Sequence, residues 1–206
     1  MADDPQDRPR PRERRDASRN RAAIVAAAER VFAAQGALAP LTAVAREAGV
    51  GRATVQRHFP DRYALAAAVY TRALDETERF AAAHADQPGL LDPLVRRIVD
   101  GQRRAAGLFP MLRAAPAAAG HLEALSARLD RILAAPVAAA VARGEVAART
   151  TVDDVRLVLA MAEGLLVSFD GDALTRALDR GLEIALDGLR PGRAEPGPAP
   201  QVRWHA

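Results

Sequence analysis

The stretch AGVGRATVQRHFPDR, from Ala48 to Arg62, decides how the N-terminal part of this chain folds. Gly49 follows an apolar-periodic run, at the position where a helix C-terminus takes a left-handed residue, and glycine adopts that conformation without a steric penalty. Val55 and Phe59 lie four residues apart, on one face of the helix that follows. The stretch therefore predicts two short helices joined by a glycine turn, with the second helix anchored to a small core.

The other face of this second helix is polar and basic. Arg52, Gln56 and Arg57 have side chains that can reach the base edges or phosphates of duplex DNA. Thr54 and His58 can donate hydrogen bonds to phosphate oxygens. Two short helices with this pattern form a helix-turn-helix, in which the second helix enters the major groove. The predicted DNA-binding residues are Arg52, Ala53, Thr54, Gln56, Arg57, His58 and Arg62.

The segments on either side of this motif complete a small helical unit. Apolar residues from Ile24 to Phe32 repeat at helical spacing up to Gly36 and predict a helix that packs behind the pair. Pro60 ends the second short helix, and Asp61 is a good N-cap for a longer helix that reaches about His84. We therefore expect a unit of three helices, followed by a fourth helix that leads out of it.

The run from about Arg19 to Tyr70 resembles the N-terminal domain of TetR-family transcriptional regulators, because its helices, glycine turn, aromatic residue and capped fourth helix follow that family's order and spacing. The resemblance implies an all-α protein. In it, a three-helix helix-turn-helix DNA-binding domain, residues 18–78, precedes a helical effector-binding and dimerisation domain, residues 79–190. The resemblance further implies a homodimer that binds double-stranded operator DNA, as a repressor released by a small apolar effector. The last two helices of each subunit would pair in a four-helix bundle.

Four positions depart from the family's usual pattern. Gln56 stands where relatives carry a tyrosine that holds a phosphate, so it either keeps a phosphate contact or pairs with an adenine edge. Arg62 stands near a usual lysine and can hold its phosphate. Gly51 and Pro40 replace residues whose hydroxyl groups cap helices. The combination that resembles the SbtR-like branch of the family is Pro40, Leu41, Gly51 and Pro60.

The composition favours a helical protein and excludes several kinds of chemistry. The 206 residues are 50% hydrophobic but only 4% aromatic, and their abundant alanine and leucine favour helix. The absence of cysteine excludes disulfides and cysteine nucleophiles. The four histidines are scattered, and no nucleophile elbow, phosphate loop or dinucleotide fingerprint occurs. We therefore expect no enzyme activity, no metal and no cofactor.

Charge and hydropathy bear on partners and location. The net charge is +3, and the positive excess lies in the N-terminal third, as is typical of a nucleic-acid-binding face. No run of about 18 apolar residues occurs and the N-terminus is polar, so we expect a cytoplasmic protein without membrane contact. Because Gln56 and Pro40 both remove usual phosphate partners, an interaction module of TetR-like fold without specific DNA binding is the alternative interpretation.

Proline-rich stretches at the two ends, residues 1–17 and 191–206, predict a disordered arm and a disordered tail. Between them the sequence predicts further helices near residues 61–84, 91–106, 108–114 and 117–142. Pro136 is expected to kink or split the last of these. Thr151 and Asp154 predict a capping box at the start of two strongly apolar C-terminal helices.

An effector pocket in the second domain is expected to be apolar, because flexible methionine and rigid phenylalanine line adaptable cavities. Its predicted lining residues are Phe109, Met111, Leu125, Met161 and Leu165. His121 and Glu163 are the polar side chains expected to orient a ligand there.

Overall fold

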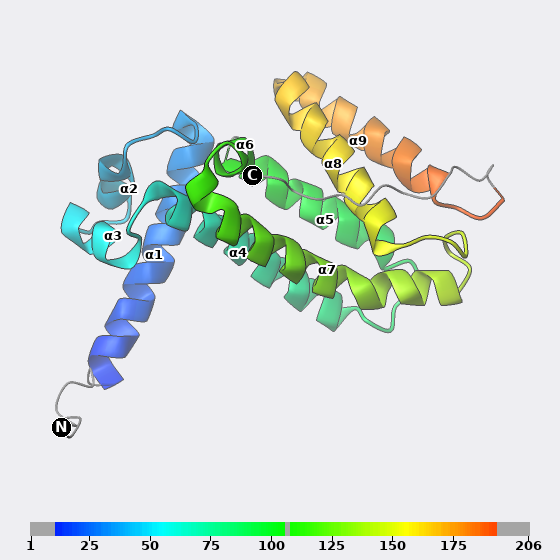
Figure 1. The fold of residues 1–206 in the computed structure, drawn as a ribbon, viewed down its shortest axis with the longest axis horizontal. Helices are drawn as coiled ribbons and strands as arrows, with labels where there is room; N and C mark the ends of the chain where they lie inside the picture. Colours follow the sequence, from blue (N-terminus) through cyan, green and yellow to red (C-terminus); the bar gives the residue numbers. More distant parts are fainter. Residues whose placement is uncertain (1–10, 106–107, 193–206) are drawn as a thin grey trace.

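The structure is a computed structural model that describes residues 11–105 and 108–192. Over these two ranges it contains nine α-helices and one short 3-10 helix, and no strand. The prediction of an all-α protein is confirmed. Figure 1 shows the first three helices gathered at one end of the molecule and the C-terminal helices at the other.

The N-terminal unit is built as the glycine turns predict. Helix α1 (Pro11–Gln35) ends at Gly36, α2 (Leu41–Glu47) is followed by Gly49, and α3 (Arg52–His58) begins two residues later. Both glycines are left-handed, with φ of +84° at Gly36 and +67° at Gly49. These turns fold α2 and α3 back against α1, as a helix-turn-helix requires.

Helix α4 (Arg62–Ala83) leads out of the N-terminal unit. The side chain of Asp61 caps it by accepting a hydrogen bond of 2.8 Å from the backbone N–H of Ala64. Leu65 and Val69 face the N-terminal core and are buried, whereas Leu74 and Thr77, further along, are buried towards the C-terminal half. One continuous helix therefore belongs to both halves of the chain.

The expectation of a disordered arm over residues 1–17 is wrong from residue 11 onwards, because α1 already begins at Pro11. Proline fits the first turn of a helix, where its missing N–H would have no intrahelical partner. Asp16 and Arg19 form an ion pair three residues apart along the helix. Residues 1–10 and 193–206, which hold the rest of the expected arm and almost all of the expected tail, lie outside the described residues.

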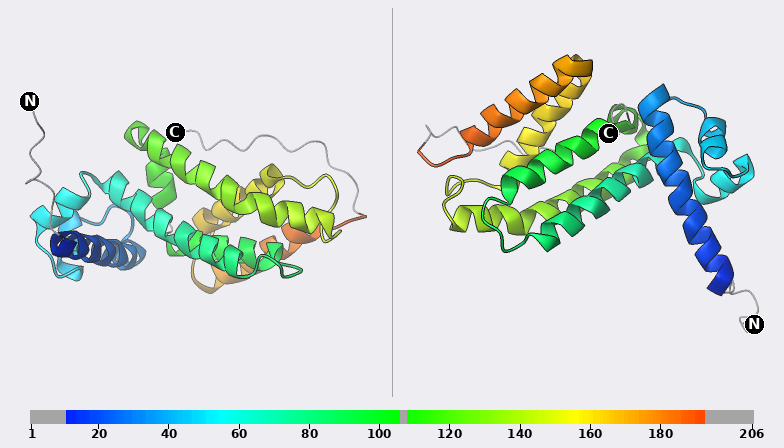
Figure 2. Two further views of the ribbon diagram at one scale, coloured as in Figure 1. Left: turned by 90° about the horizontal axis from the view of Figure 1, so that it is seen from below. Right: turned by 180° about the vertical axis from the view of Figure 1, so that it is seen from behind.

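The C-terminal half contains five α-helices, three of which pack extensively against α4. They are α5 (Leu91–Arg104), α6 (Leu108–Arg113), α7 (Ala119–Ala142), α8 (Val152–Ser168) and α9 (Gly171–Gly188), with a 3-10 turn, η2 (Pro116–Ala118), between α6 and α7. Helix α7 lies alongside α4, α8 pairs with α9, and α5 lies between α4 and α8 (Figures 1 and 2).

The structure tests the predicted capping box and the expected split of a helix at Pro136. The capping box is confirmed: the Thr151 hydroxyl accepts a bond of 3.3 Å from the Asp154 N–H, and the Asp154 carboxylate accepts one of 2.8 Å from the Thr151 N–H. Pro136 does not split α7, which continues through it to Ala142. Pro136 is buried, so its packing offsets the one backbone hydrogen bond that proline removes.

The apolar core of the N-terminal unit does not end at that unit. Leu108 and Leu112 of α6 and Leu122 of α7 are buried in the same cluster as Ile24 and Phe32 of α1. A second cluster joins α5, α7, α8 and α9. The expected domain boundary after residue 78 falls inside α4, and the two halves share both a helix and a continuous apolar contact.

A network of ion pairs also crosses from the first half to the second. Glu29 of α1 lies 3.8 Å from Arg72 of α4 and 3.5 Å from Arg104 of α5, and Glu76 of α4 lies 3.7 Å from Arg104 and 4.0 Å from Arg97. Each pair is partly exposed, so each alone contributes about 1 kcal/mol or less. Together they add a polar contact between α1, α4 and α5.

Gly49 and Gly51 allow a matched test of the turn, because a Cβ at either position would meet no atom within 4 Å. Gly49→Ala should lower the free energy of unfolding by about 1 to 2 kcal/mol, since only its left-handed φ of +67° opposes a side chain. Gly51→Ser should raise it by a few tenths of a kcal/mol, because Gly51 is an extended N-cap without a side-chain cap. Urea denaturation measures both, and equal losses in the two variants would contradict the assignment.

Candidate functional site

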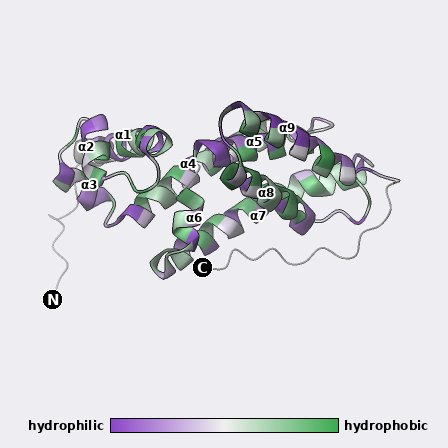
Figure 3. Cartoon of the chain, turned by 90° about the horizontal axis from the view of Figure 1, so that it is seen from above, coloured by the Kyte–Doolittle hydropathy of each residue, from purple (hydrophilic) through white to green (hydrophobic). Residues whose placement is uncertain are grey.

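Helix α3 is held by one face and free on the other. Val55 is fully buried and Phe59 is 1% exposed, both within the N-terminal core. Arg52, Gln56 and Arg57 are exposed, and none of them makes a hydrogen bond or an ion pair with any described residue. Figure 3 shows α2 and α3 at the end of the molecule, with hydrophilic residues on their outer side. The side chains that sequence reasoning assigned to DNA therefore stand on an open surface.

The remaining predicted residues flank this surface. Ala53 is exposed and leaves the backbone of the first turn of α3 accessible, whereas Thr54 is half-buried. Arg62 is half-buried in the first turn of α4, next to the cap residue Asp61, and has no ion-pair partner within the described residues. The structure brings all seven predicted residues to α3 and the start of α4. A surface with unpaired guanidinium groups at its centre and edge is suited to polyanion binding.

His58, at the end of α3, differs from the simple expectation of an outward phosphate donor. Its Nε2 atom is buried and has no hydrogen-bond partner among the described residues. Burial lowers the pKa of His58, and the positive charges of Arg57 and Arg21 lower it further. The ring is therefore mainly neutral at pH 7, and a phosphate contact would have to use its other nitrogen.

Arg21 of α1 is a residue that sequence reasoning missed. Its guanidinium lies 4.4 Å from the centre of the Phe59 ring and donates a hydrogen bond of 3.4 Å to the His58 carbonyl. It thereby fastens the end of α3 to α1 through a cation–π contact. The signal was present, since Arg21 precedes the buried Ile24 by three residues and so borders the core face of α1.

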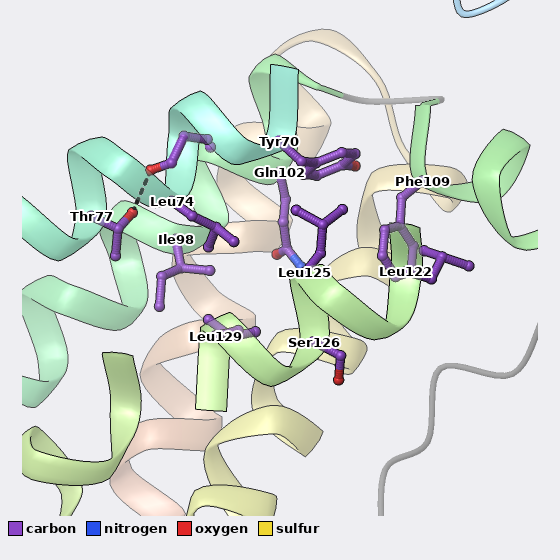
Figure 4. A pocket seen from close by; sticks show the side chains of 12 residues that line it. Tyr70, Leu74, Thr77, Ile98, Gln102, Phe109, Leu122, Leu125, Ser126 and Leu129 are labelled. Carbon is purple, nitrogen blue, oxygen red and sulfur yellow. Dashed lines mark hydrogen bonds between the residues drawn. The ribbon is translucent and has the colours of Figure 1, made fainter. Parts of the chain in front are cut away.

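An apolar cavity of about 60 Å³ lies between α4, α5, α6 and α7. Leu74, Ile98, Leu125 and Phe109 form much of its wall, and Figure 4 shows the amide of Gln102 among them. The Thr77 hydroxyl at its edge is already bonded to the Ala73 carbonyl at 2.8 Å. The cavity is therefore apolar apart from a few polar groups, as ligand sites usually are.

A second cavity, of about 270 Å³, adjoins the first and shares Tyr70, Gln102 and Phe109 with it. Tyr70 and Phe109 meet edge to face, with ring centres 5.8 Å apart. Glu163 of α8 lines the second cavity, where burial raises the pKa of its carboxyl and the charge of Arg113 partly counteracts this. Burial and the nearby charge of Glu163 raise the pKa of Tyr70, which stays protonated.

The predicted pocket residues lie in several different parts of the structure. Phe109 and Leu125 line the first cavity, and Glu163 lines the second. Met111 packs against the N-terminal core, and His121 is exposed on α7 and lines none of the described cavities. Met161 and Leu165 line a different apolar hollow, between α8 and α9. These side chains do not converge on one ligand site.

Sequence reasoning also missed Tyr70 and Gln102, which border both cavities. Gln102 continues the apolar positions Val95 and Ile98 of α5 at helical spacing, so it is a polar residue within an apolar stripe. That interruption was a readable signal of a cavity. Tyr70 had no comparable signal, because an aromatic residue on a core-facing helix is ordinary.

Two further properties hold for the described part of the chain. It contains no group of three or more histidine, cysteine or acidic side chains that could hold a metal ion. Among its helices, none has the length and apolar character needed to cross a membrane.

An exposed basic helix after a glycine turn, braced by α1 and followed by a capped helix, defines a helix-turn-helix DNA-binding protein. Residues 24–69 match the family described as bacterial regulatory proteins, tetR family. A comparison with curated protein sequences found no significant match.

Solved structures give three informative likenesses. A TetR transcriptional regulator from Streptomyces coelicolor is 32% identical, with 84% of this chain and 99% of that chain covered and a TM-score of 0.65. A TetR transcription regulatory protein from Mycobacterium vanbaalenii is 34% identical, with 86% and 98% covered and a TM-score of 0.56. FadR from Thermus thermophilus, a transcriptional repressor in complex with lauroyl-CoA, shares the fold at 22% identity, with 87% and 98% covered and a TM-score of 0.54. The chain belongs to the TetR family of transcriptional regulators, which act by binding DNA and not as enzymes.

The environment of His58 gives a prediction about pH. Its pKa should lie below the ordinary histidine value of about 6.5 and should rise in Arg21→Gln, which removes one of the repelling charges. At a pH between the pKa of His58 in the folded protein and its pKa in the unfolded chain, the unfolded chain holds more protons. The contribution of neutral His58 to the free energy of unfolding is therefore complete above about pH 6.5 and is lost as the pH falls through the pKa of the folded protein. NMR titration of the ring and urea unfolding from pH 7 to 5 measure the two effects. A His58→Gln variant with an unchanged stability slope would contradict the assignment.

Proposed function

We propose that this protein is a homodimeric repressor whose α3 enters the major groove of its operator. The observation that carries the proposal is that Arg52, Gln56 and Arg57 stand exposed and unpaired on a helix whose opposite face is fully buried. Such a helix presents base-reading and phosphate-binding groups without having to break internal contacts. A regulator of this kind acts where the chromosome is, so the proposal places it in the cytoplasm.

The side chains have different proposed roles. Arg52 and Gln56, one turn apart on α3, read base edges, with Gln56 suited to an adenine. Thr54, Arg57, His58 and Arg62 hold phosphates and so set the register of the helix on the duplex. For Gln56 a phosphate contact remains the alternative. Pro40, Leu41, Gly51 and Pro60 support assignment to the SbtR-like branch.

The proposed dimer uses α8 and α9. Met161 is 49% exposed and Ile184 is 58% exposed, and both line the apolar hollow between these helices. The two helices approach closely at Gly181, where a Cβ would lie 2.7 Å from the Leu165 side chain. A flat pair of helices with exposed apolar residues fits a symmetric bundle with the same pair of a second subunit. The α3 helices of the two subunits would then bind half-sites separated by one helical turn of DNA, about 34 to 36 Å, or a multiple of it.

The proposed effector site is the pair of cavities beside α4. Residues Tyr70, Leu74 and Thr77 of α4 line them, and α4 starts directly after α3. A ligand that binds more tightly when α4 stands away from α5 and α7 would favour a dimer with altered spacing of its reading helices. The lauroyl-CoA complex of the Thermus thermophilus regulator supports a small-molecule effector for this fold. We propose residues 18–78 as the DNA-binding domain and 79–190 as the effector-binding and dimerisation domain, with the last part of the first domain also contributing α4 side chains to the effector site.

The competing interpretation is an interaction module that has lost specific DNA binding. Pro40 gives α2 no side-chain cap, and so removes one phosphate partner. Selection of bound fragments from random duplex DNA tests the two directly. A recurrent palindromic motif supports the repressor, whereas no retention even on generic duplex DNA at low salt, where phosphate contacts alone give affinity, would support the module.

Arg52 and Arg62 should respond differently to truncation. Arg52→Ala should cost about 1 to 3 kcal/mol on the selected operator and relax the preference at one base position. Arg62→Ala should weaken binding to all sequences alike and reduce the salt slope by about 1. Fluorescence anisotropy at two salt concentrations measures both. Arg79→Ala, which removes an exposed arginine near the far end of α4, is the matched control and should leave DNA affinity unchanged.

The dimer face gives a separate prediction. Ile184→Arg should convert the protein to a monomer, because it places an uncompensated charge in the apolar contact. Leu38→Arg makes the same change at a residue that is 77% exposed but lies between α1 and α2, and should leave the dimer intact. Light scattering coupled to gel filtration gives both masses. A dimeric Ile184→Arg variant would remove α9 from the interface.

A further inference from the structure

The two cavities beside α4 combine an apolar wall with hydrogen-bond acceptors that have no partner. They share Tyr70, Gln102 and Phe109, so a single elongated molecule can extend from one into the other. The first is lined mainly by aliphatic and aromatic residues, and the second opens towards α8 and Glu163. An amphiphile with an apolar body and one polar end matches this division.

Gln102 contributes the first unsatisfied group. Its Oε1 atom is buried and has no hydrogen-bond partner among the described residues. Figure 4 shows this amide inside the cavity, with Leu125 and Ile98 close to it. A buried acceptor without a donor is unfavourable, so a ligand that brings an N–H or O–H group there restores a lost interaction.

Glu163 contributes the second hydrogen-bond acceptor without a partner in the described part of the chain. It is half-buried, lines the second cavity, and makes no hydrogen bond or ion pair with any described residue. The Tyr70 hydroxyl lies at the same cavity and donates its proton to the Ala105 carbonyl at 3.4 Å, and the Phe109 backbone also hydrogen-bonds to it, so it has no proton to offer a ligand. The polar groups that meet the ligand at this end are therefore mainly acceptors, and one of them can carry a negative charge.

The charges of the lining residues favour a cationic over an anionic head group. No arginine or histidine is among the lining residues described for either cavity. Arg113, whose charge acts on Glu163, is not among these lining residues. A carboxylate or phosphate in the second cavity would therefore face Glu163 without a cation in the cavity wall to compensate it, whereas an ammonium group would be attracted.

We propose that these cavities bind a small amphiphilic amine, with its alkyl or aryl body in the first cavity and its ammonium group donating to Glu163 and Gln102. The inference deepens the proposed function by giving the chemical class of the effector. The aromatic pair of Tyr70 and Phe109, between the two cavities, presents ring faces and edges to the carbon adjacent to the ammonium.

Three probes with the same chain and different head groups test the proposal: octylamine, octanol and octanoate, each below its micelle concentration at pH 7. Calorimetry on the full-length protein without DNA should show octylamine binding at least about tenfold more tightly than octanol, and octanoate binding most weakly. Tightest binding of octanoate, or equal affinities for the three, would overturn it.

Variants then assign the preference to named groups. Glu163→Gln should lower octylamine affinity about tenfold and leave octanol affinity nearly unchanged, which also shows that the cavity remains folded. Glu123→Gln makes the same change at an exposed carboxylate of α7 that lines neither cavity, and should behave as the unaltered protein does. An octylamine preference that persists in Glu163→Gln would overturn the proposal.

The DNA-binding proposal is tested separately from this one. Because the calorimetry contains no DNA, a protein that fails to bind any operator can still show the amine preference. Once an operator is selected, octylamine should weaken operator binding in the unaltered protein and have less effect in Glu163→Gln. Amine binding that leaves operator affinity unchanged would overturn the assignment of the amine as the effector class.

Discussion

The burial of Val55 and Phe59 is the constraint on which the rest of the molecule depends. A seven-residue helix is too short to persist in water by itself, so α3 keeps its shape because one face is packed into the N-terminal core. Arg21 reinforces that packing from α1 through the Phe59 ring. Because the buried face of α3 is fixed, the orientation of its exposed face is fixed as well. The arginine side chains on that face are therefore presented in a defined direction although they form no ion pair with any described residue.

Helix α4 connects this reading surface to the cavities. Its first turns pack on the same core as α3, and its later turns form a wall of both cavities. The ion pairs of Glu29 and Glu76 with arginines of α4 and α5 add a polar link between the same elements. A change in the cavity thus has a direct physical path to α3, made of one helix and its side-chain contacts.

The sequence was most informative where local rules decide the structure. Left-handed glycines, the Asp61 cap and the Thr151 capping box follow from chemistry within a few residues, and the structure has each of them. The helical state of residues 11–17 does not follow from composition, because proline and charged residues are typical of disordered segments and also suit a first helical turn. The pocket was harder to predict, because the convergence of Tyr70, Gln102 and Glu163 depends on how three helices pack. Residue type alone does not reveal this: Met161 suits an apolar pocket but lines the hollow between α8 and α9.

The burial of Leu108, Leu112 and Leu122 in the N-terminal core has a consequence for dissecting the protein. A fragment that ended after residue 78 would keep the reading helix but would lose the three leucines that cover its core from outside. It would expose to water the surface that these side chains shield, and would be prone to self-association. The shared core therefore favours unfolding of the two halves as one cooperative unit, and an exchange of the N-terminal half between regulators would also have to carry α6 and the first turns of α7.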